Sequence, residues 1–151
     1  MKEIKKVLFP VDFSEVSPRI STWVLGIGEK FDAEVHVLFV ARQFEYFASI
    51  HVNTGSIERF EKEIIEGAEI MMKEFVEGYL EGHLAFKTKV VLGDAAEEIL
   101  SYVESEDVNL VVMGTHGRKG IEKIFFGSVE ERVIKNSPVP VMSVNPYRAL
   151  S

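Results

Sequence analysis

Glycines and basic residues follow directly after an apolar run in the last third of the chain. The run Leu110–Met113 predicts a buried strand, and Gly114 and Gly117 come after it. After nine intervening residues, Gly127 and Ser128 open a predicted helix. Glycines after a strand let the backbone approach a ligand without a Cβ in the way. A helix N-terminus offers unpaired amides that favour an anion. This order of elements therefore predicts a phosphate-binding site.

The elements that would position this loop alternate along the chain. Strands are expected at 4–9, 34–40, 86–92, 108–113 and 139–144, and helices at 18–31, 57–82, 94–106 and 128–135. Apolar strands that alternate with helices indicate a parallel sheet covered on both faces. With right-handed crossovers, the favoured fold is α/β, a doubly wound five-stranded parallel sheet of order 3-2-1-4-5. A single domain over residues 1–151 is expected.

Capping residues mark three of the predicted helix starts. Ser17 is expected to be the N-cap before Pro18. Asp94 with Glu97 and Ser128 with Glu131 each have capping-box spacing. Ser128 could therefore serve only to start a helix. The buried face of the long helix is predicted to comprise Ile57, Phe60, Ile64, Ala68, Met71, Phe75 and Tyr79.

A second candidate group lies at the end of the first strand. In a doubly wound sheet, ligands bind beyond the carboxyl ends of the strands, where the winding reverses. Strand one ends at Val11 and Asp12 and strand four at Gly114, so Asp12 should face the glycine loop. Its carboxylate could accept hydrogen bonds from ribose hydroxyls, or could only form a turn. Val40 and Ala41 would supply an apolar wall for a flat base. These positions predict a nucleotide site.

Four stretches carry a family resemblance that covers nearly the whole chain. They are VLFPVDFSE, GDAAEEIL, VVMGTHGRKG and FFGSVEERVIKNSPVPVMSV. Together with the spacing Gly114-x2-Gly117-x9-Gly127-Ser128, they resemble the ATP-binding branch of the universal stress protein family. The resemblance implies an adenine nucleotide alpha hydrolase-like fold and a regulatory, stress-response role.

The resemblance also implies roles for individual residues, which divide into two sets. On the sugar and base side are Pro10, Val11, Asp12, Val40, Met113 and Gly114, with Asp12 holding ribose or base and Val40 bonding adenine through its backbone. Around the phosphates are His116, Gly117, Arg118, Gly127, Ser128 and Val129, largely through backbone amides. The implied ligand is ATP, with AMP and ADP as alternatives, accompanied by Mg²⁺. A nucleotide-dependent homodimer through the last strand, about Val139 to Val144, is implied as well.

One position departs from the family pattern. Binding members often have a small or hydroxylated residue after the serine and valine, whereas this chain has Glu130, followed by Glu131. Carboxylates in a first helical turn favour the helix. Near a triphosphate they would repel it, unless they point outward or a divalent cation screens them. Two alternatives therefore stay open: a dimeric interaction protein that binds no nucleotide, and a slow ATP hydrolase.

The amino-acid composition limits which functions the protein can have. A net charge of −7 argues against a general nucleic-acid or anionic-membrane surface. There is no cysteine, and the four histidines lack metal-ligand spacing, so no metal site within the protein is expected. The first apolar run is too short for a signal peptide, which predicts a cytoplasmic protein. Only His116 is a candidate base, and the sequence favours a binding protein over an enzyme.

Overall fold

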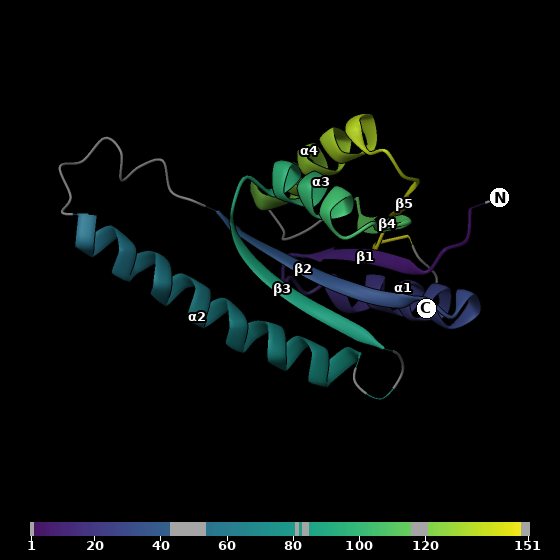
Figure 1. The fold of residues 1–151 in the computed structure, drawn as a ribbon, viewed down its shortest axis with the longest axis horizontal. Helices are drawn as coiled ribbons and strands as arrows, with labels where there is room; N and C mark the ends of the chain where they lie inside the picture. Colours follow the sequence, from purple (N-terminus) through teal and green to yellow (C-terminus); the bar gives the residue numbers. More distant parts are fainter. Residues whose placement is uncertain (1, 43–53, 81, 83–84, 116–120, 149–151) are drawn as a thin grey trace.

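The computed structural model describes residues 2–42, 54–80, 82, 85–115 and 121–148, with only the backbone described for residues 54 and 121–127. It contains a five-stranded sheet with four helices (Figure 1). The strands are β1 Lys6–Val11, β2 Glu34–Arg42, β3 Phe86–Gly93, β4 Leu110–Gly114 and β5 Val141–Val144. The helices are α1 Ser17–Phe31, α2 Thr54–Tyr79, α3 Ala95–Ser105 and α4 Ile121–Asn136.

The sheet has the order β3-β2-β1-β4-β5, and every pairing is parallel. The predicted topology is thus confirmed. The central strand β1 pairs with β2 from Lys6–Glu34 to Val11–Phe39. It is buried from Val7 to its end, because helices cover both faces of the sheet.

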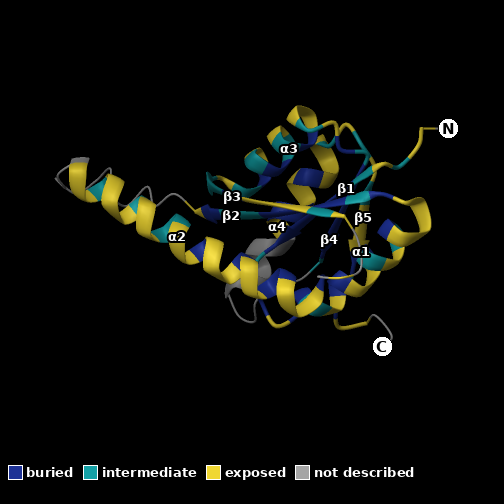
Figure 2. Cartoon of the chain, turned by 60° about the horizontal axis from the view of Figure 1, so that its bottom comes forward, coloured by how far each residue is buried: buried dark blue, intermediate teal, exposed yellow. Residues whose placement is uncertain are grey.

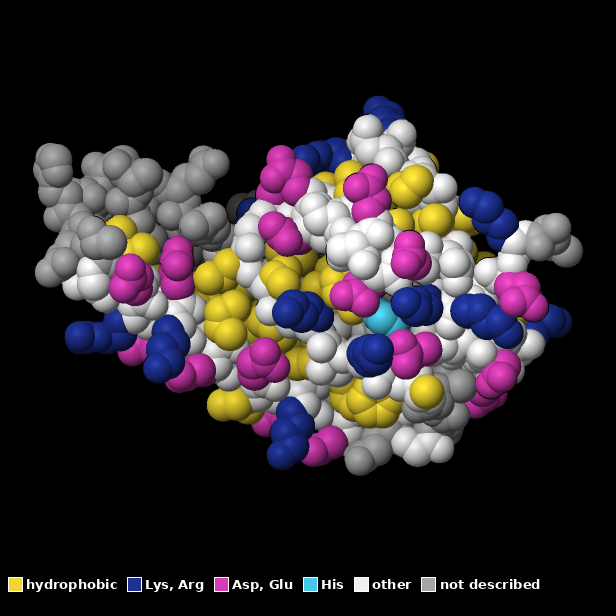
Figure 3. All heavy atoms as spheres, viewed as in Figure 1, with side chains coloured by type: hydrophobic (Ala, Val, Ile, Leu, Met, Phe, Trp, Pro, Cys, Tyr) yellow, Lys and Arg dark blue, Asp and Glu magenta, His cyan; other side chains and the backbone are white. Residues whose placement is uncertain are grey.

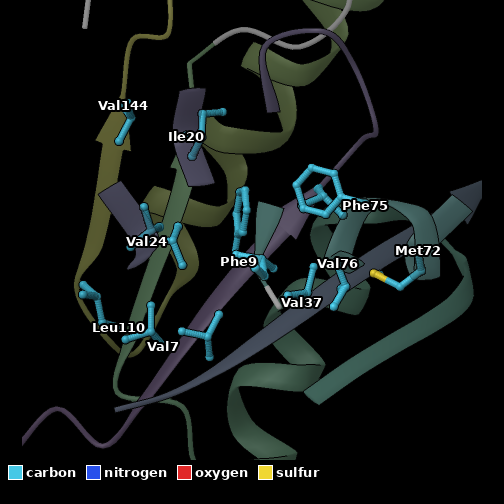
Figure 4. Close-up of a cluster of buried hydrophobic side chains, with 14 of the residues drawn as sticks. Val7, Phe9, Ile20, Val24, Val37, Met72, Phe75, Val76, Leu110 and Val144 are labelled. Atoms are coloured by element: carbon cyan, nitrogen blue, oxygen red, sulfur yellow. The ribbon is translucent and has the colours of Figure 1, made fainter. Parts of the chain in front are cut away.

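Two apolar clusters flank the sheet. α1 and α2 pack on one face, which Figure 4 shows from within, and this cluster includes Val7, Phe9, Ile20, Val24, Val37, Met72, Phe75, Val76, Leu110 and Val144. α3 and α4 pack on the other face, with Leu8, Leu38, Ala96, Ile99, Val103, Val111, Met113, Val129 and Val133. The alternation of β1 side chains between the clusters follows from the two-residue period of a strand.

The long helix α2 is only partly covered by the sheet. Its buried residues are Ala68, Met72, Phe75 and Val76, all in its second half. Figure 2 shows the first half projecting past the sheet with an exposed surface. The predicted face was therefore right for Ala68 and Phe75 and wrong for Phe60, Met71 and Tyr79, which are exposed. A helix longer than the sheet lacks a partner along part of its length. No described helix is both long and apolar enough to cross a membrane.

Helix caps agree with the sequence at α3 and differ at α1. The Asp94 carboxylate accepts the Glu97 amide at 3.0 Å, as predicted. At α1 the N-cap is Val16, with no side-chain cap, and Ser17 is the first helical residue. The prediction that Ser17 is the cap was wrong, because its hydroxyl donates instead to Asp12.

Candidate functional site

A crevice is expected where the winding of the sheet reverses, between β1 and β4. The β1–β2 pairing runs through Val11–Phe39, whereas the β1–β4 pairing comprises Val7–Leu110 and Leu8–Val111. If the β1–β4 register continues to the ends of the two strands, Val11 lies opposite Gly114. Asp12 therefore follows β1 at the carboxyl edge, beside the end of β4, where ligands of doubly wound sheets bind.

Only one of the two Asp12 carboxylate oxygens accepts hydrogen bonds from the described residues. Asp12 Oδ1 accepts the Ser14 amide at 2.9 Å and the Ser17 hydroxyl at 3.0 Å. Its Oδ2 accepts no hydrogen bond from the described residues, and the side chain is half-buried. Asp12 thus forms the turn that the sequence allowed as an alternative. The same two bonds fix the orientation of the second oxygen, which can accept a further donor.

Ser14 supplies an unsatisfied hydroxyl two residues from Asp12. The residue is 6% exposed, and its Oγ has no hydrogen-bond partner among the described residues. A buried polar atom without a partner costs about 1–3 kcal/mol, so such an atom typically meets a ligand or a water. Sequence reasoning did not select Ser14 or Ser17 as site residues. The available signal was the spacing Asp12-x-Ser14-x2-Ser17, since aspartate and serine turns bond their own backbone.

Phe13 adopts a left-handed backbone conformation between these polar residues. Its φ is 58°, which is costly for a bulky L-residue. The ring packs against Phe39, with centroids 4.5 Å apart, and against Phe75 at 6.0 Å. This aromatic packing holds the strained turn in place. Backbone strain of this kind clusters at ligand sites, where it orients a neighbouring group.

The end of β2 borders the crevice next to β1. Val40 is half-buried and Ala41 is buried, so both predicted wall residues are apolar and partly or fully covered. Val40 pairs with Val91 of β3 but lies one residue beyond the end of the β1 pairing at Phe39. Its amide still belongs to the β1 ladder, because the Val11–Phe39 pair of a parallel sheet uses the amide of the following residue, whereas its carbonyl lies beyond the last pair.

The strand residues implied to line the sugar are mainly buried. Pro10 and Val11 lie inside β1, and Met113 packs fully buried in the α3–α4 cluster. Met113 can line a ligand through its backbone alone. Gly114 ends β4, and the next amide, of Thr115, donates to the Val144 carbonyl at 2.9 Å.

The start of α4 differs from the prediction. The helix begins at Ile121, so Gly127 and Ser128 lie inside it and the predicted start at Ser128 is wrong. The seven residues before Ser128 contain no proline, and one glycine weakens a helix by about 1 kcal/mol without ending it. Interior amides donate to carbonyls four residues earlier. The amides of α4 that have no partner within the helix are those of its first turn, residues 121–124.

The other phosphate-side residues are placed as follows. Val129 is buried in the α3–α4 cluster, and Ser128 is exposed. His116, Gly117 and Arg118 lie outside the described residues. The predicted Ser128–Glu131 capping box does not open α4; Glu131 instead pairs with Lys135 at 2.9 Å.

Glu130 points toward the sheet. It is 7% exposed, and its carboxylate accepts a hydrogen bond from the Ser143 hydroxyl of β5. This departure from the family pattern therefore places the Glu130 carboxylate against β5, where the Ser143 hydroxyl donates to it. A carboxylate oriented this way does not face outward over the start of α4.

An ion pair joins α4 to α3. Arg132 lies 3.1 Å from the Asp94 carboxylate. The Glu97 amide, followed by the Arg132 guanidinium, lowers the pKa of Asp94 below its ordinary value. Within the described part of the chain, no three carboxylate or imidazole groups converge as metal ligands.

The sheet order and the all-parallel pairing define a doubly wound α/β protein with the adenine nucleotide alpha hydrolase-like fold. The pattern of the universal stress protein family matches residues 3–145. The chain belongs to the universal stress protein family.

Two relatives from Methanocaldococcus jannaschii are each 34% identical to the chain. Universal stress protein MJ0531 aligns over 93% of this chain and 81% of its own length, and MJ0577 over 93% and 94%. The solved structure of MJ0577 has a TM-score of 0.81 at 29% identity, covering 99% of this chain and 100% of that one.

Two more distant structures share the fold and were solved with nucleotides. The Arabidopsis thaliana protein with AMP bound has a TM-score of 0.64 at 19% identity, covering 93% of this chain and 91% of that one. The Archaeoglobus fulgidus protein in complex with dAMP has a TM-score of 0.57 at 17% identity, covering 95% and 100%.

Proposed function

We propose that this protein is a cytoplasmic, ATP-binding regulator of the stress response that acts as a nucleotide-dependent homodimer. The observation that carries the proposal is the Asp12 turn. One carboxylate oxygen is fixed by two hydrogen bonds, the other is available, and the buried Ser14 hydroxyl beside it lacks a partner among the described residues. These groups suit the hydroxyls of a ribose.

The proposed pose places the base and the sugar on the β1–β2 side. Asp12 Oδ2 accepts a ribose hydroxyl, and the backbone carbonyl of Val40, beyond the last β1 pair, bonds adenine. The backbone of Met113 and Gly114 lines the sugar. Pro10 and Val11 support Asp12 from inside β1.

The phosphate side requires a change in α4. For Gly127, Ser128 and Val129 to offer amides to a phosphate, the turns at residues 121–127 must unwind, because interior amides are already paired. His116, Gly117 and Arg118 would complete this side. We infer that the nucleotide-bound form has a shorter α4, and that nucleotide binding is thereby coupled to the packing of α4.

The ligand is proposed to be ATP, with AMP and ADP as competitors, because AMP and dAMP occupy proteins of the same fold. The described residues offer no cluster of metal ligands, so Mg²⁺ would be held chiefly by the phosphates themselves. With ATP bound, the ion would offset repulsion between the phosphates and acidic side chains such as Glu131.

The homodimer is proposed to form through β5. Among the described strands, β5 pairs with β4 alone, and Met142 is 38% exposed on it. Replacing Met142 by lysine should convert dimers to monomers, because it places a charge in the proposed contact. Sedimentation with and without ATP measures this; an unchanged mass in the variant would contradict the proposed contact.

Isothermal titration with ATP, ADP and AMP tests the nucleotide proposal. Saturable heat for an adenine nucleotide, with a raised melting temperature, is expected. GTP is the matched control and should bind more weakly, since the Val40 backbone would select adenine. Absence of heat and of thermal protection with every nucleotide would reject the proposal.

A dimeric interaction protein that binds no nucleotide is the second candidate. The observation that favours it is the helical start of α4, which pairs the amides of residues 127–129 within the helix. Adenine nucleotide retained by protein purified from cells would reject this candidate. Hydrolysis is a separate question, tested by phosphate release in the wild type and His116→Ala.

A further inference from the structure

The strand β3 ends the sheet on the side opposite β5. It pairs with β2 over eight residues, and no described strand covers its outer edge. Residues 87–89 are exposed. A strand edge of this length presents a row of backbone amides and carbonyls to which an extended chain can add.

An apolar groove lies on one side of this edge, between α2 and β3. Its volume is about 540 Å³, and Ile70, Met72, Val76 and Phe86 supply its apolar lining. Ile70 is 61% exposed there. Figure 3 shows hydrophobic side chains gathered in this region, bordered by charged ones. The groove can accept apolar side chains from an added strand.

A second groove of about 470 Å³, here called the α3 groove, lies on the other side, between β3 and α3, and its charged lining residues are two lysines and two glutamates. Lys87 and Lys89 point into it, since side chains alternate along a strand. Lys87 lies 3.5 Å from Glu34, whereas Lys89 makes no ion pair within the described part of the chain. Glu98 and Glu106 also line this groove.

The two glutamates lie toward the ends of the α3 groove. A Cβ at Gly93 would lie 2.7 Å from the Glu98 carboxylate, which puts Glu98 at the carboxyl end of β3. Glu106 follows Tyr102 by one helical turn, and Tyr102 contacts His36, the strand partner of Lys87. Glu106 is thus near the other end. Lys87 and Lys89 therefore lie between the two glutamates along this groove.

Tyr102 lines the α3 groove and is hydrogen-bonded. Its hydroxyl lies 2.7 Å from His36 Nδ1, and His36 Nε2 donates to Glu34 at 2.7 Å, because an ionised carboxylate only accepts. Burial raises the pKa of Tyr102 to about 12, so this phenol stays protonated. The lysines are therefore the groups on β3 that a ligand's charge would meet.

We propose that β3 binds an extended peptide segment in which apolar and acidic residues alternate. As an added strand, it would place its apolar side chains in the α2 groove and its acidic ones beside Lys87 and Lys89. A second copy of this chain fits less well. Antiparallel pairing of two β3 edges would bring lysines of both copies onto one face, and like charges opposite each other destabilise a sheet.

A blocked heptapeptide of sequence Thr-Val-Glu-Val-Glu-Val-Thr is the probe, titrated into the full-length protein and followed by backbone amide NMR. Shifts concentrated at residues 86–93 are expected. Two further peptides are N-methylated, one at every valine and the other at every glutamate. Alternate residues of a strand face its partner. One methylated peptide should therefore lose binding and the other retain it.

Two variants test the side chains. Lys89→Glu should weaken binding roughly threefold, as expected for a partly exposed ion pair, with Lys30→Glu on α1 as the charge-matched control. Ile70→Ser should weaken it roughly fivefold, with the half-exposed Ile134→Ser on α4 as control. Ile70 and Lys89 are exposed, so both variants should fold.

Three results would overturn the proposal. The first is the absence of shifts at residues 86–93 at millimolar peptide. The second is equal binding of both N-methylated peptides, which would mean that charge alone attracts them. The third is self-association of the protein through β3, detected as protection of the same amides at high protein concentration without peptide.

Discussion

The two walls of the crevice are organised in different ways. On the β1 wall, the Asp12 turn is fixed by two hydrogen bonds and by the packing of Phe13. On the α4 wall, the segment expected to be a loop before Ser128 is helical. One wall is thus ready for the proposed ligand, whereas the other has to change. The comparison teaches that preorganised and adaptable halves can share one site.

Loss of the Asp12 carboxylate should have the largest effect. Asp12→Ala removes an ionised hydrogen-bond acceptor worth about 1.5–3 kcal/mol, which corresponds to roughly 10- to 150-fold weaker ATP binding. Titration calorimetry below the melting temperature measures it. The control is Glu15→Ala, which removes an exposed carboxylate three residues away. Equal affinities of wild type and Asp12→Ala would remove the β1 wall from the site.

The backbone strain at Phe13 should have the second largest effect, which is on the stability of the protein. Phe13→Ala removes the aromatic ring but keeps the energetic cost of a positive φ. Phe13→Gly removes the ring and this cost together, because glycine has no Cβ. The alanine variant should therefore have a lower free energy of unfolding than the glycine variant by about 1 kcal/mol, which is the reverse of the order in helices and strands. Urea unfolding compares them. If alanine proves the more stable, the strained conformation does not exist in solution.

A stiffer α4 should weaken nucleotide binding. Gly127→Ala favours the helix by about 1 kcal/mol, so ATP binding that unwinds this turn should weaken roughly fivefold. Gly26→Ala in α1 is the matched control, because a Cβ there meets nothing within 4 Å. Unchanged or tighter binding by Gly127→Ala would show that the helical form is the one that binds.

The smallest effect concerns the anchor of α4 on α3. The folded-state pKa of Asp94 is lowered, so its contribution to stability is present above its ordinary pKa and is lost as pH falls through the lowered value. Asp94→Asn should be less stable than the wild type at pH 6, and the difference should be smaller at about pH 3, below the ordinary pKa of an aspartate. Urea unfolding at the two pH values measures it. A difference that persists undiminished at low pH would assign the effect to the cap geometry alone.

The sequence was sufficient to predict the strand order, the place of Asp12 and the Asp94 cap. Each depends on a strong local signal: apolar strand runs, a carboxylate just after a strand, and capping-box spacing. Ser17 was assigned wrongly because a serine before proline suits a cap, while Asp12, five residues earlier, competes for the same hydroxyl.

The remaining differences depend on contacts that a sequence pattern does not contain. Nothing in a phenylalanine indicates a positive φ, and Phe13 takes it because Phe39 and Phe75 hold its ring. The glycines around α4 suggested a loop, but Gly127 only weakens a helix. On α2, Met71 and Tyr79 fit the predicted apolar face, yet the sheet is in contact with the neighbouring face, through Met72 and Val76.

The packing of Phe13 has a consequence for the order of events during synthesis. Phe75, which helps hold the Phe13 ring, comes 62 residues later in the chain. A nascent chain that has only β1 and α1 outside the ribosome lacks this support. The Asp12 turn should consequently mature only after α2 has emerged and docked, so a truncated product that ends before α2 would not assemble the proposed ribose-binding end of the site.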